Sequence, residues 1–201
     1  MARTLRTVSD RKGDRTRQRL LRIAIRRFAT DGYRRTSVSE IAREAGVTPA
    51  TTYAYFAGKE GLFHAAVDAD TAAFMAEARA NVSGASVRSR WMPWLPSLVA
   101  GLVDHPLAAR VLKGQEPDML PRLLDLESVR SVRDELTEEL RQGQKTGEVR
   151  ADVDPTALAC GLESVVMALL MAYLQAGRGQ SIERAVGIVS VLDAALRSPD
   201  E

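Results

Sequence analysis

The segment from residue 31 to residue 63, DGYRRTSVSEIAREAGVTPATTYAYFAGKEGLF, constrains the fold more than any other part of the chain. Ser37 and Glu40 have the S-x-x-E spacing of a capping box, which predicts that a helix begins there. Apolar residues then recur at helical spacing as far as Gly46, which can end a helix because glycine adopts the left-handed conformation at no steric cost. The sequence therefore predicts a short helix followed by a tight turn.

A second short helix is expected directly after this turn. Thr48 is a suitable N-cap, and Pro49 takes the first helical position, where no backbone N–H is needed. These signals predict a helix over residues 49–55 whose face is mostly small: Ala50, Thr51, Thr52 and Ala54. Small side chains let a helix backbone approach base edges closely. We therefore expect residues 37–56 to form a helix-turn-helix that binds DNA.

Residues beside the second helix have the chemistry of phosphate contacts. Tyr53 and Tyr55 place phenolic hydroxyls where phosphate oxygens would lie, and Lys59 opens the next expected helix. The alternative is purely structural, because helical hairpins with a glycine turn are common in all-α proteins. In that case Tyr53 would be core, as Phe56 is expected to be in either case.

Charge is distributed unevenly along the chain. Residues 1–60 carry 14 Lys and Arg against 6 Asp and Glu, whereas residues 61–201 carry 14 against 20. A basic head on an acidic body indicates an anionic partner bound at one end, and nucleic acid is the simplest such partner. A membrane surface is disfavoured because no expected helix pairs a basic face with a bulky apolar one. A merely solvated basic surface is the remaining alternative.

The segment 14–67 resembles the N-terminal part of the TetR family of bacterial transcriptional repressors. The resemblance, with the caps above, gives these candidate DNA-binding residues: Ser37, Ser39, Thr48, Pro49, Ala50, Thr51, Tyr53, Tyr55 and Lys59. Two residues depart from the family pattern. Tyr55 replaces a frequent histidine but still supplies a donor hydroxyl, and Thr52 replaces a bulky aliphatic residue, so the recognition helix is expected to pack less firmly.

The whole pattern predicts an all-α protein of about nine helices. Residues 1–13 are expected to be a flexible basic arm, residues 14–62 a three-helix DNA-binding head, and residues 63–201 a helical body for ligand binding and dimerisation. The first helix should run over about 15–30, capped by Asp14 and stopped by Gly32. Further helices are expected at about 58–80, 88–104, 106–114, 118–143, 155–176 and 181–197.

The last two helices predict a homodimer. Each has more apolar surface than the single stripe that a surface helix of a monomer needs, so a second copy is expected to cover the rest. The candidate interface residues are Leu162, Val166, Leu170, Val189, Leu192 and Leu196, and Gly161 and Gly187 would allow close approach. The last two long helices form the dimer in the TetR family, so the resemblance implies the same arrangement.

An aromatic and methionine-rich cluster in the body predicts either plain core or a ligand cavity. The candidate ligand-binding residues are Trp91, Trp94, Met119, Leu123, Glu163, Met167 and Met171. Methionine adapts to varied ligands, and few charges lie on these stretches, so a ligand should be largely apolar. Glu163 stands alone among apolar residues and could meet a polar or cationic ligand group or simply cap the dimer interface.

Other functions have little support in the sequence. The single cysteine, Cys160, and two distant histidines provide no metal site, and no catalytic motif is present, so we expect no cofactor, no metal and no enzyme activity. The longest apolar run, residues 165–174, is half of what spans a bilayer, and no apolar stretch follows the basic N-terminus as in a signal peptide. A cytoplasmic protein without a membrane partner is expected.

These observations together predict a homodimeric DNA-binding transcriptional regulator. The expected form is a repressor that a small, largely apolar effector releases from a palindromic operator in double-stranded DNA. The alternative is a helical small-molecule-binding or interaction protein whose basic head does not act on operator DNA.

Overall fold

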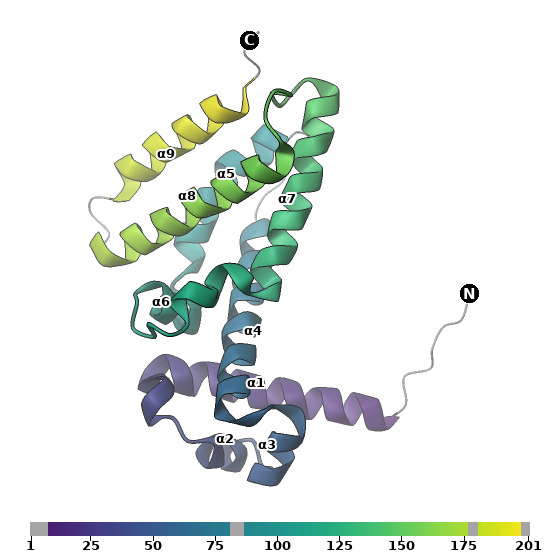
Figure 1. Cartoon of the computed structure of the whole chain (residues 1–201). Helices are drawn as coiled ribbons and strands as arrows, with labels where there is room; N and C mark the ends of the chain where they lie inside the picture. The colour runs from purple at the N-terminus through teal and green to yellow at the C-terminus, as the bar shows by residue number, and fades with distance from the viewer. Residues whose placement is uncertain (1–7, 81–86, 177–180, 198–201) are drawn as a thin grey trace. The chain divides into compact units, whose positions relative to one another are not determined.

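The computed structural model describes residues 8–80, 87–176 and 181–197, and this part of the chain is helical without β-strands (Figure 1). It contains α1 (Val8–Arg35), α2 (Val38–Glu44), α3 (Pro49–Tyr55), α4 (Gly58–Ala80), α5 (Val87–Gly101), α6 (Pro106–Leu112), the 3₁₀ helix η1 (Leu120–Asp125), α7 (Glu127–Thr146), α8 (Pro155–Ala176) and α9 (Ser181–Leu196). The predicted all-α class is confirmed. The chain divides inside α4 into two compact units, which we call the head (to Asp70) and the body (from Thr71).

The first helix of the head starts earlier than the sequence predicts. α1 begins at Val8, so Asp14 lies inside the helix instead of capping it, and residues 8–13 of the expected arm are helical. Residues 1–7 of that arm lie outside the described residues. The predicted stop is confirmed, because Gly32 has φ 79° and ψ 167°, a conformation that interrupts the helix and favours glycine.

The turn between α2 and α3 forms around Gly46, as predicted. Gly46 has φ 65°, and its N–H donates to the Arg43 carbonyl at 3.1 Å. The N–H of Val47 donates to the Ala42 carbonyl at 3.0 Å, which completes a Schellman motif and ends α2. The predicted capping box at the other end of α2 does not form, because the Ser37 side chain makes no capping hydrogen bond.

Aromatic and aliphatic side chains form the core of the head. The rings of Phe28 and Phe63 meet edge to face with centroids 5.0 Å apart, and Tyr33 lies at the same distance from Phe63. Other buried residues of this core are Leu20, Ala24, Ile41, Ala42, Phe56, Leu62 and Ala66. The predicted bounds of α3 and the burial of Phe56 are both confirmed.

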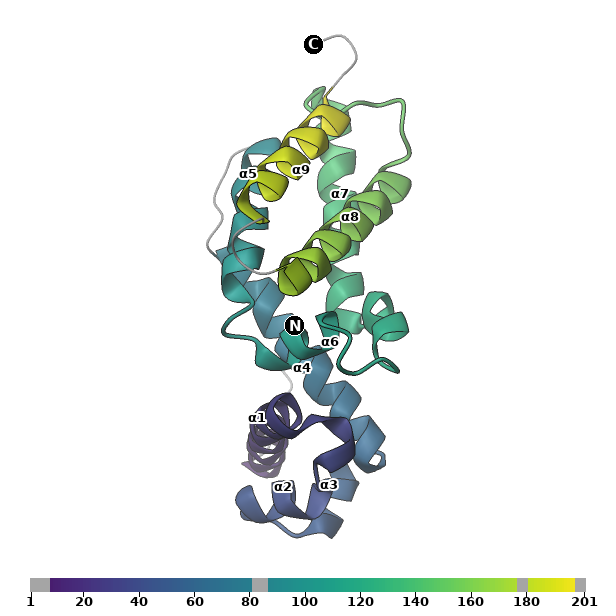
Figure 2. The same cartoon turned by 90° about the vertical axis from the view of Figure 1, so that its left-hand side faces the viewer.

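In the body, α7 and α8 pack against each other, and α9 packs beside α5 and α8 (Figure 2). Their core cluster contains Leu136, Leu140, Val149, Ala159, Leu162 and Leu196. Hydrogen bonds fix the loop that joins α7 to α8. The N–H of Arg150 donates to the Leu196 carbonyl at 3.0 Å, and the Gln144 amide donates to the Arg150 carbonyl at 2.9 Å.

The region before α8 differs from the predicted single helix over residues 118–143. The chain instead forms η1 and α7, separated by Leu126, whose backbone is not helical (φ −59°, ψ 138°). Pro121 lies in η1, and proline removes a hydrogen-bond donor that a continuous α-helix would use. α7 then passes through the buried Gly143 and ends at Gly147, which has φ 79°.

One polar side chain in the core of the head lacks a hydrogen-bond partner. Thr52, on α3, is 1% exposed, and its Oγ1 is buried without a hydrogen bond to any described residue. A buried donor or acceptor left unpaired costs about 1–3 kcal/mol. Thr52 is thus well buried, and its unpaired hydroxyl is a local energetic cost.

Replacing Thr52 by valine keeps the branched shape and removes this hydroxyl. We expect Thr52→Val to stabilise the chain by about 1 kcal/mol, measured as a higher thermal midpoint by circular dichroism. Thr51→Val is the matched control, because the Thr51 hydroxyl lies 2.9 Å from the Thr48 hydroxyl and its loss should bring no stabilisation. An unchanged or lower midpoint for Thr52→Val would contradict this account.

Candidate functional site

The outward face of α3 carries small side chains and one tyrosine. Thr48, Pro49, Ala50 and Ala54 are exposed, and 54% of Tyr53 is exposed. Tyr53 is therefore a surface residue, which removes the structural alternative for this side chain. Such a face can approach another surface closely, and the Tyr53 hydroxyl offers a hydrogen-bond donor at its edge.

The start of α3 is fixed by Thr48, as predicted. Its Oγ1 accepts a hydrogen bond from the Thr51 N–H at 3.2 Å, and Pro49 follows at the first helical position. The side-chain hydroxyls of Thr48 and Thr51 also lie 2.9 Å apart and share a hydrogen bond, so part of their hydrogen-bonding capacity is used within α3 and its cap. At the start of α2, Ser39 is exposed and Ser37 is half-buried.

An open hollow of about 900 Å³ lies between the first turns of α1 and the α2–α3 motif. It is lined by Lys12, Gly13, Asp14, Thr16, Arg17, Arg19, Gly46, Val47, Thr51 and Tyr55. Tyr55 reaches close to α1, since a Cβ on Gly13 would lie 3.5 Å from its hydroxyl oxygen. Lys12 and Arg19 add positive charge beside α3. Neither residue is among the predicted DNA-binding residues, because Lys12 is expected in the flexible arm and Arg19 on the solvent face of the first helix.

Lys59 lies in the first turn of α4, as expected, but its ammonium group is held within the head. Nζ donates a hydrogen bond to the Arg34 carbonyl at 3.1 Å and lies 4.7 Å from the centroid of the Tyr33 ring. The second contact is a cation–π interaction. An ammonium group has three donors, so Lys59 keeps donors for an incoming anion while it anchors α4 to the last turn of α1.

Part of the positive charge of α1 is neutralised inside the head. Glu44, at the end of α2, pairs with both Arg26 and Arg27, and the Arg27 Nε lies 3.0 Å from Glu44 Oε2. These pairs tie α1 to α2. The positive charge that lines the hollow beside α3 comes from Lys12, Arg17 and Arg19, and neither Arg26 nor Arg27 lines it.

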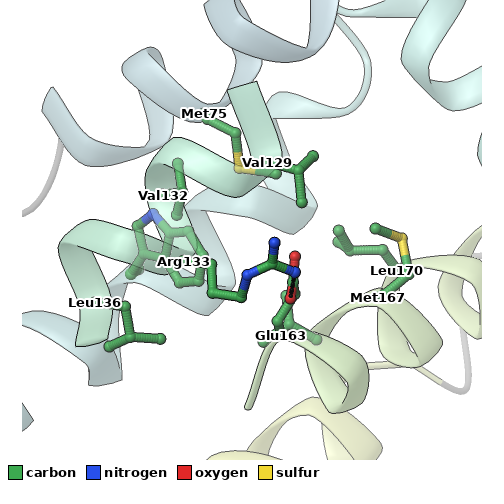
Figure 3. Close-up of a pocket in the computed structure, with 10 residues that line it drawn as sticks. Met75, Val129, Val132, Arg133, Leu136, Glu163, Met167 and Leu170 are labelled. Atoms are coloured by element: carbon green, nitrogen blue, oxygen red, sulfur yellow. Dashed lines mark hydrogen bonds and ion pairs between the residues drawn. The ribbon is translucent and has the colours of Figure 1, made fainter. Parts of the chain in front are cut away.

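The body contains a small cavity whose walls come from α4, α5, α7 and α8 (Figure 3). It has a volume of about 40 Å³ and is lined by Met75, Trp94, Val129, Val132, Arg133, Leu136, Glu163, Val166, Met167 and Leu170. This volume suits a few water molecules. A larger guest requires side chains to move, and Met75 and Met167 have the conformational freedom to do so.

Two charged side chains meet in this otherwise apolar cavity. Arg133 of α7 and Glu163 of α8 point toward each other (Figure 3), with the Arg133 Nη1 3.0 Å from the Glu163 Oε2. Their side chains are 24% and 13% exposed. The other carboxylate oxygen, Oε1, is buried and accepts no hydrogen bond from a described residue. Burial raises the pKa of the Glu163 carboxyl above its ordinary value, and Arg133 partly offsets that rise.

The cavity is built from a different set of residues than the sequence predicts for a ligand site. Of the predicted residues, it is lined by Trp94, Glu163 and Met167. The predicted residues that do not line it are Met119, Leu123 and Met171. The side chain of Trp91 lies outside the described residues. The main partner of α8 is α7, which supplies Val129, Val132, Arg133 and Leu136 to the cavity in place of the predicted Met119 and Leu123.

Arg133 is the main residue that the sequence analysis missed. Val129, Val132 and Leu136 recur at helical spacing on α7, and Arg133 lies among them. A charged residue on an apolar helix face is a signal for a buried partner, because an unpaired buried charge is very costly. That signal, taken with the isolated Glu163, would have suggested the pair.

Four of the six predicted dimer-interface residues belong instead to the interior of the body. Leu162, Val166, Leu170 and Leu196 are at most 6% exposed within the single chain. Leu162 and Leu196 lie in the core cluster with α7, and Val166 and Leu170 line the cavity. The physical reason is that α7 covers this face of α8. Val189 and Leu192 are half-buried on α9.

A different face of α8 and α9 is both apolar and exposed. Val165 is 40% exposed and Val191 is 66% exposed, and a Cβ added to Gly161 or Gly187 would meet no atom of a described residue within 4 Å. Among the described helices, α8 is long and apolar enough to cross a membrane by length and composition, with a mean hydropathy of 1.9 over Pro155–Gln175. Only 28% of that window is buried, so α8 exposes apolar surface that the described residues do not cover.

Two family models match this chain, one in each unit. Residues 20–66 match the model of bacterial regulatory proteins of the tetR family, and residues 116–189 match the tetracyclin repressor-like C-terminal domain. The uncharacterized HTH-type transcriptional regulator YdgC of Bacillus subtilis (strain 168) is 42% identical over 52 residues. That match spans 26% of this chain and 27% of YdgC, and it therefore bears on about a quarter of each protein.

Solved structures share the fold over most of the chain. FadR from Bacillus subtilis in complex with stearoyl-CoA has a TM-score of 0.70 and 17% identity, covering 90% of this chain and 99% of FadR. The fatty acid degradation regulator FadR from Bacillus halodurans has a TM-score of 0.65 and 19% identity, covering 89% and 93%. A TetR/AcrR-family regulator from Thermobifida fusca YX-ER1 has a TM-score of 0.62 and 24% identity, covering 92% and 99%. With both units matched by family models and the helix-turn-helix in place, the chain belongs to the TetR family of transcriptional regulators.

Proposed function

We propose that this regulator is a homodimeric repressor that binds a palindromic operator through α3 and leaves it when a small, largely apolar effector occupies the body cavity. Family membership makes it a DNA-binding regulator and not an enzyme. The observation that carries the operator proposal is α3 itself. It is capped by Thr48, exposes small side chains with Tyr53 at the edge, and lies in a strongly basic head.

In this proposal α3 enters the major groove and the surrounding groups hold the DNA backbone. Pro49, Ala50 and Thr51 start the recognition helix and meet base edges through small groups, directly or through water. The proposed phosphate contacts are Ser37, Ser39, Tyr53, Tyr55 and Lys59, together with Lys12 and Arg19 of α1. A ligand-binding or interaction protein without DNA would give no reason for a capped, exposed helix beside this basic hollow.

The proposed homodimer forms through the exposed face of α8 and α9. That face is apolar at Val165 and Val191, and Gly161 and Gly187 leave room for close approach of a second helix pair. Glycine within a helix costs roughly 1 kcal/mol relative to alanine, and contacts with the described residues do not account for it at these two positions. A symmetric second copy would cover the same face on both partners. We place the protein in the cytoplasm, where its operator is.

The effector is proposed to act through α4. This helix starts in the head, where Lys59 is anchored, and carries Met75 into the wall of the cavity. A ligand shifts DNA affinity only if it binds two conformations unequally. FadR from Bacillus subtilis, which shares the fold, binds stearoyl-CoA in its structure, and this supports a small-molecule site in the body.

Removing the Tyr53 hydroxyl tests the operator proposal. In gel-shift experiments on the DNA next to its own gene, Tyr53→Phe should weaken binding by about 2–10-fold, because one phosphate hydrogen bond is lost. The loss should be the same for operator variants, since phosphate contacts carry no sequence information. Tyr173→Phe, in the body, is the control and should bind normally. A change in base preference without loss of affinity would show that Tyr53 reads bases.

Placing charge on the exposed face tests the dimer. Val191→Arg should convert a dimer into monomer or aggregate in sedimentation experiments, because the arginine would be buried unpaired at the interface. Val103→Arg is the matched control, since Val103 is equally exposed but lies outside α8 and α9. If Val191→Arg remains a dimer, the interface must lie elsewhere. If the wild type is a monomer, the proposed homodimer is wrong.

Filling the cavity tests release. An apolar compound that raises the thermal midpoint of the wild type should lower the affinity of the protein for its operator by about 5–150-fold. Bound operator should lower the affinity of the protein for that compound by the same factor. Met167→Trp should keep DNA affinity and lose the response. Met171→Trp is the control on the same helix, because Met171 does not line the cavity. Equal compound affinity with and without operator would contradict release through this site.

A further inference from the structure

The Arg133–Glu163 pair is the charged feature of the cavity wall. The other lining residues are Met75, Trp94, Val129, Val132, Leu136, Val166, Met167 and Leu170. Trp94 brings a single indole N–H, and the rest are apolar. A molecule bound there must therefore be recognised by shape and by this pair. The state of the pair before binding decides which chemical group it can accept.

Glu163 has one occupied and one unused carboxylate oxygen. Oε2 lies 3.0 Å from Arg133 Nη1, while Oε1 is buried and accepts no hydrogen bond from a described residue. A buried acceptor left unpaired is destabilising, so a guest group that donates to Oε1 would supply a hydrogen bond that no described residue provides. The same burial raises the pKa of this carboxyl above its ordinary value, and Arg133 opposes that rise.

Charge balance selects among possible donors. Arg133 and Glu163 together carry no net charge, so a cationic guest would leave one uncompensated positive charge in an apolar cavity. An anionic guest would have to compete with Glu163 for Arg133 and would leave one uncompensated negative charge. Either outcome carries the desolvation cost of an unpaired buried ion. An uncharged donor satisfies Oε1 and leaves the ion pair intact.

We infer that the cavity accepts an uncharged, mostly apolar molecule with one hydrogen-bond donor, such as a phenol or an alcohol, and that this donor binds Glu163 Oε1. The inference rests on the proposed function, because it names the effector class for the same cavity. It sets this protein apart from its fold relative that holds stearoyl-CoA, since that ligand carries several phosphate charges. The lining of this cavity has a single cationic group, and that group is already paired.

Four probes with one apolar body separate the possibilities. They are 4-propylphenol, its methyl ether 4-propylanisole, 4-propylbenzoate and 4-propylbenzylamine, each titrated calorimetrically into the full-length protein at pH 7. We expect the phenol to bind at least ten-fold more tightly than the ether, which equals about 1.4 kcal/mol. The benzoate and the benzylamine should bind more weakly than the phenol.

A paired substitution tests the role of Glu163. Arg133→Met with Glu163→Met replaces the ion pair by apolar side chains of similar length, an exchange that buried pairs often tolerate. In this double variant the phenol and the ether should bind within about two-fold of each other. Arg110→Met with Glu116→Met is the matched control, because that pair is comparably buried in the body, with 2.7 Å between its atoms, but does not line the cavity. It should keep the preference for the phenol.

Each result either supports or overturns the inference. Equal affinities for the phenol and the ether, tightest binding of the benzoate or benzylamine, or no binding of any probe to the wild type would overturn it. A double variant that keeps the ten-fold preference would do the same, and if that variant does not fold, the four wild-type affinities decide alone. Failure of the proposed function is separate, because gel shifts of the protein on its operator involve none of these probes. If the phenol and the ether bind the wild type equally and Met167→Trp abolishes binding of both, the cavity is still the binding site. Only the requirement for a hydrogen-bond donor is then rejected.

Discussion

The turn between α2 and α3 is held by backbone hydrogen bonds around Gly46, and the head depends on it. The left-handed conformation of Gly46 lets the Val47 N–H reach the Ala42 carbonyl, and Thr48 caps α3 directly afterwards. The direction of α3 is therefore set by main-chain geometry and one threonine. Its outer face needs no large side chains to fix it, so that face can consist of Pro49, Ala50 and Ala54.

Local signals in the sequence predicted the helix ends that local chemistry controls. Gly46 and Thr48 do what their residue types favour, and Asp154 caps α8 by accepting from the Ala157 N–H at 2.9 Å. Where a boundary depends on the rest of the structure, such signals are insufficient. α1 extends back to Val8 although residues 8–13 carry no apolar stripe, and Pro121 signals an irregular segment without fixing the break at Leu126.

The faces of α8 show why the candidate sites were harder to predict than the helices. This helix is apolar nearly all round, so periodicity does not tell which side is core, which lines a cavity and which is exposed. The packing of α7 makes that choice by covering Leu162, Val166 and Leu170 and leaving Val165 exposed. The same packing brings Arg133 to Glu163, residues that are 30 positions apart and have no shared sequence motif.

The small size of the body cavity has a consequence for timing. At about 40 Å³ the cavity has room for a few water molecules, so the conformation described here must open before a larger molecule enters. If opening precedes binding, the observed association rate reaches a plateau at high ligand concentration, where the opening rate sets the limit. The measured association constant is also lower than that of the open form, because it equals that constant multiplied by the fraction of molecules that are open. The regulator would then respond on the timescale of its own side-chain and helix movements around Met75 and Met167, and a stiffer body would respond both more slowly and only at higher ligand concentrations.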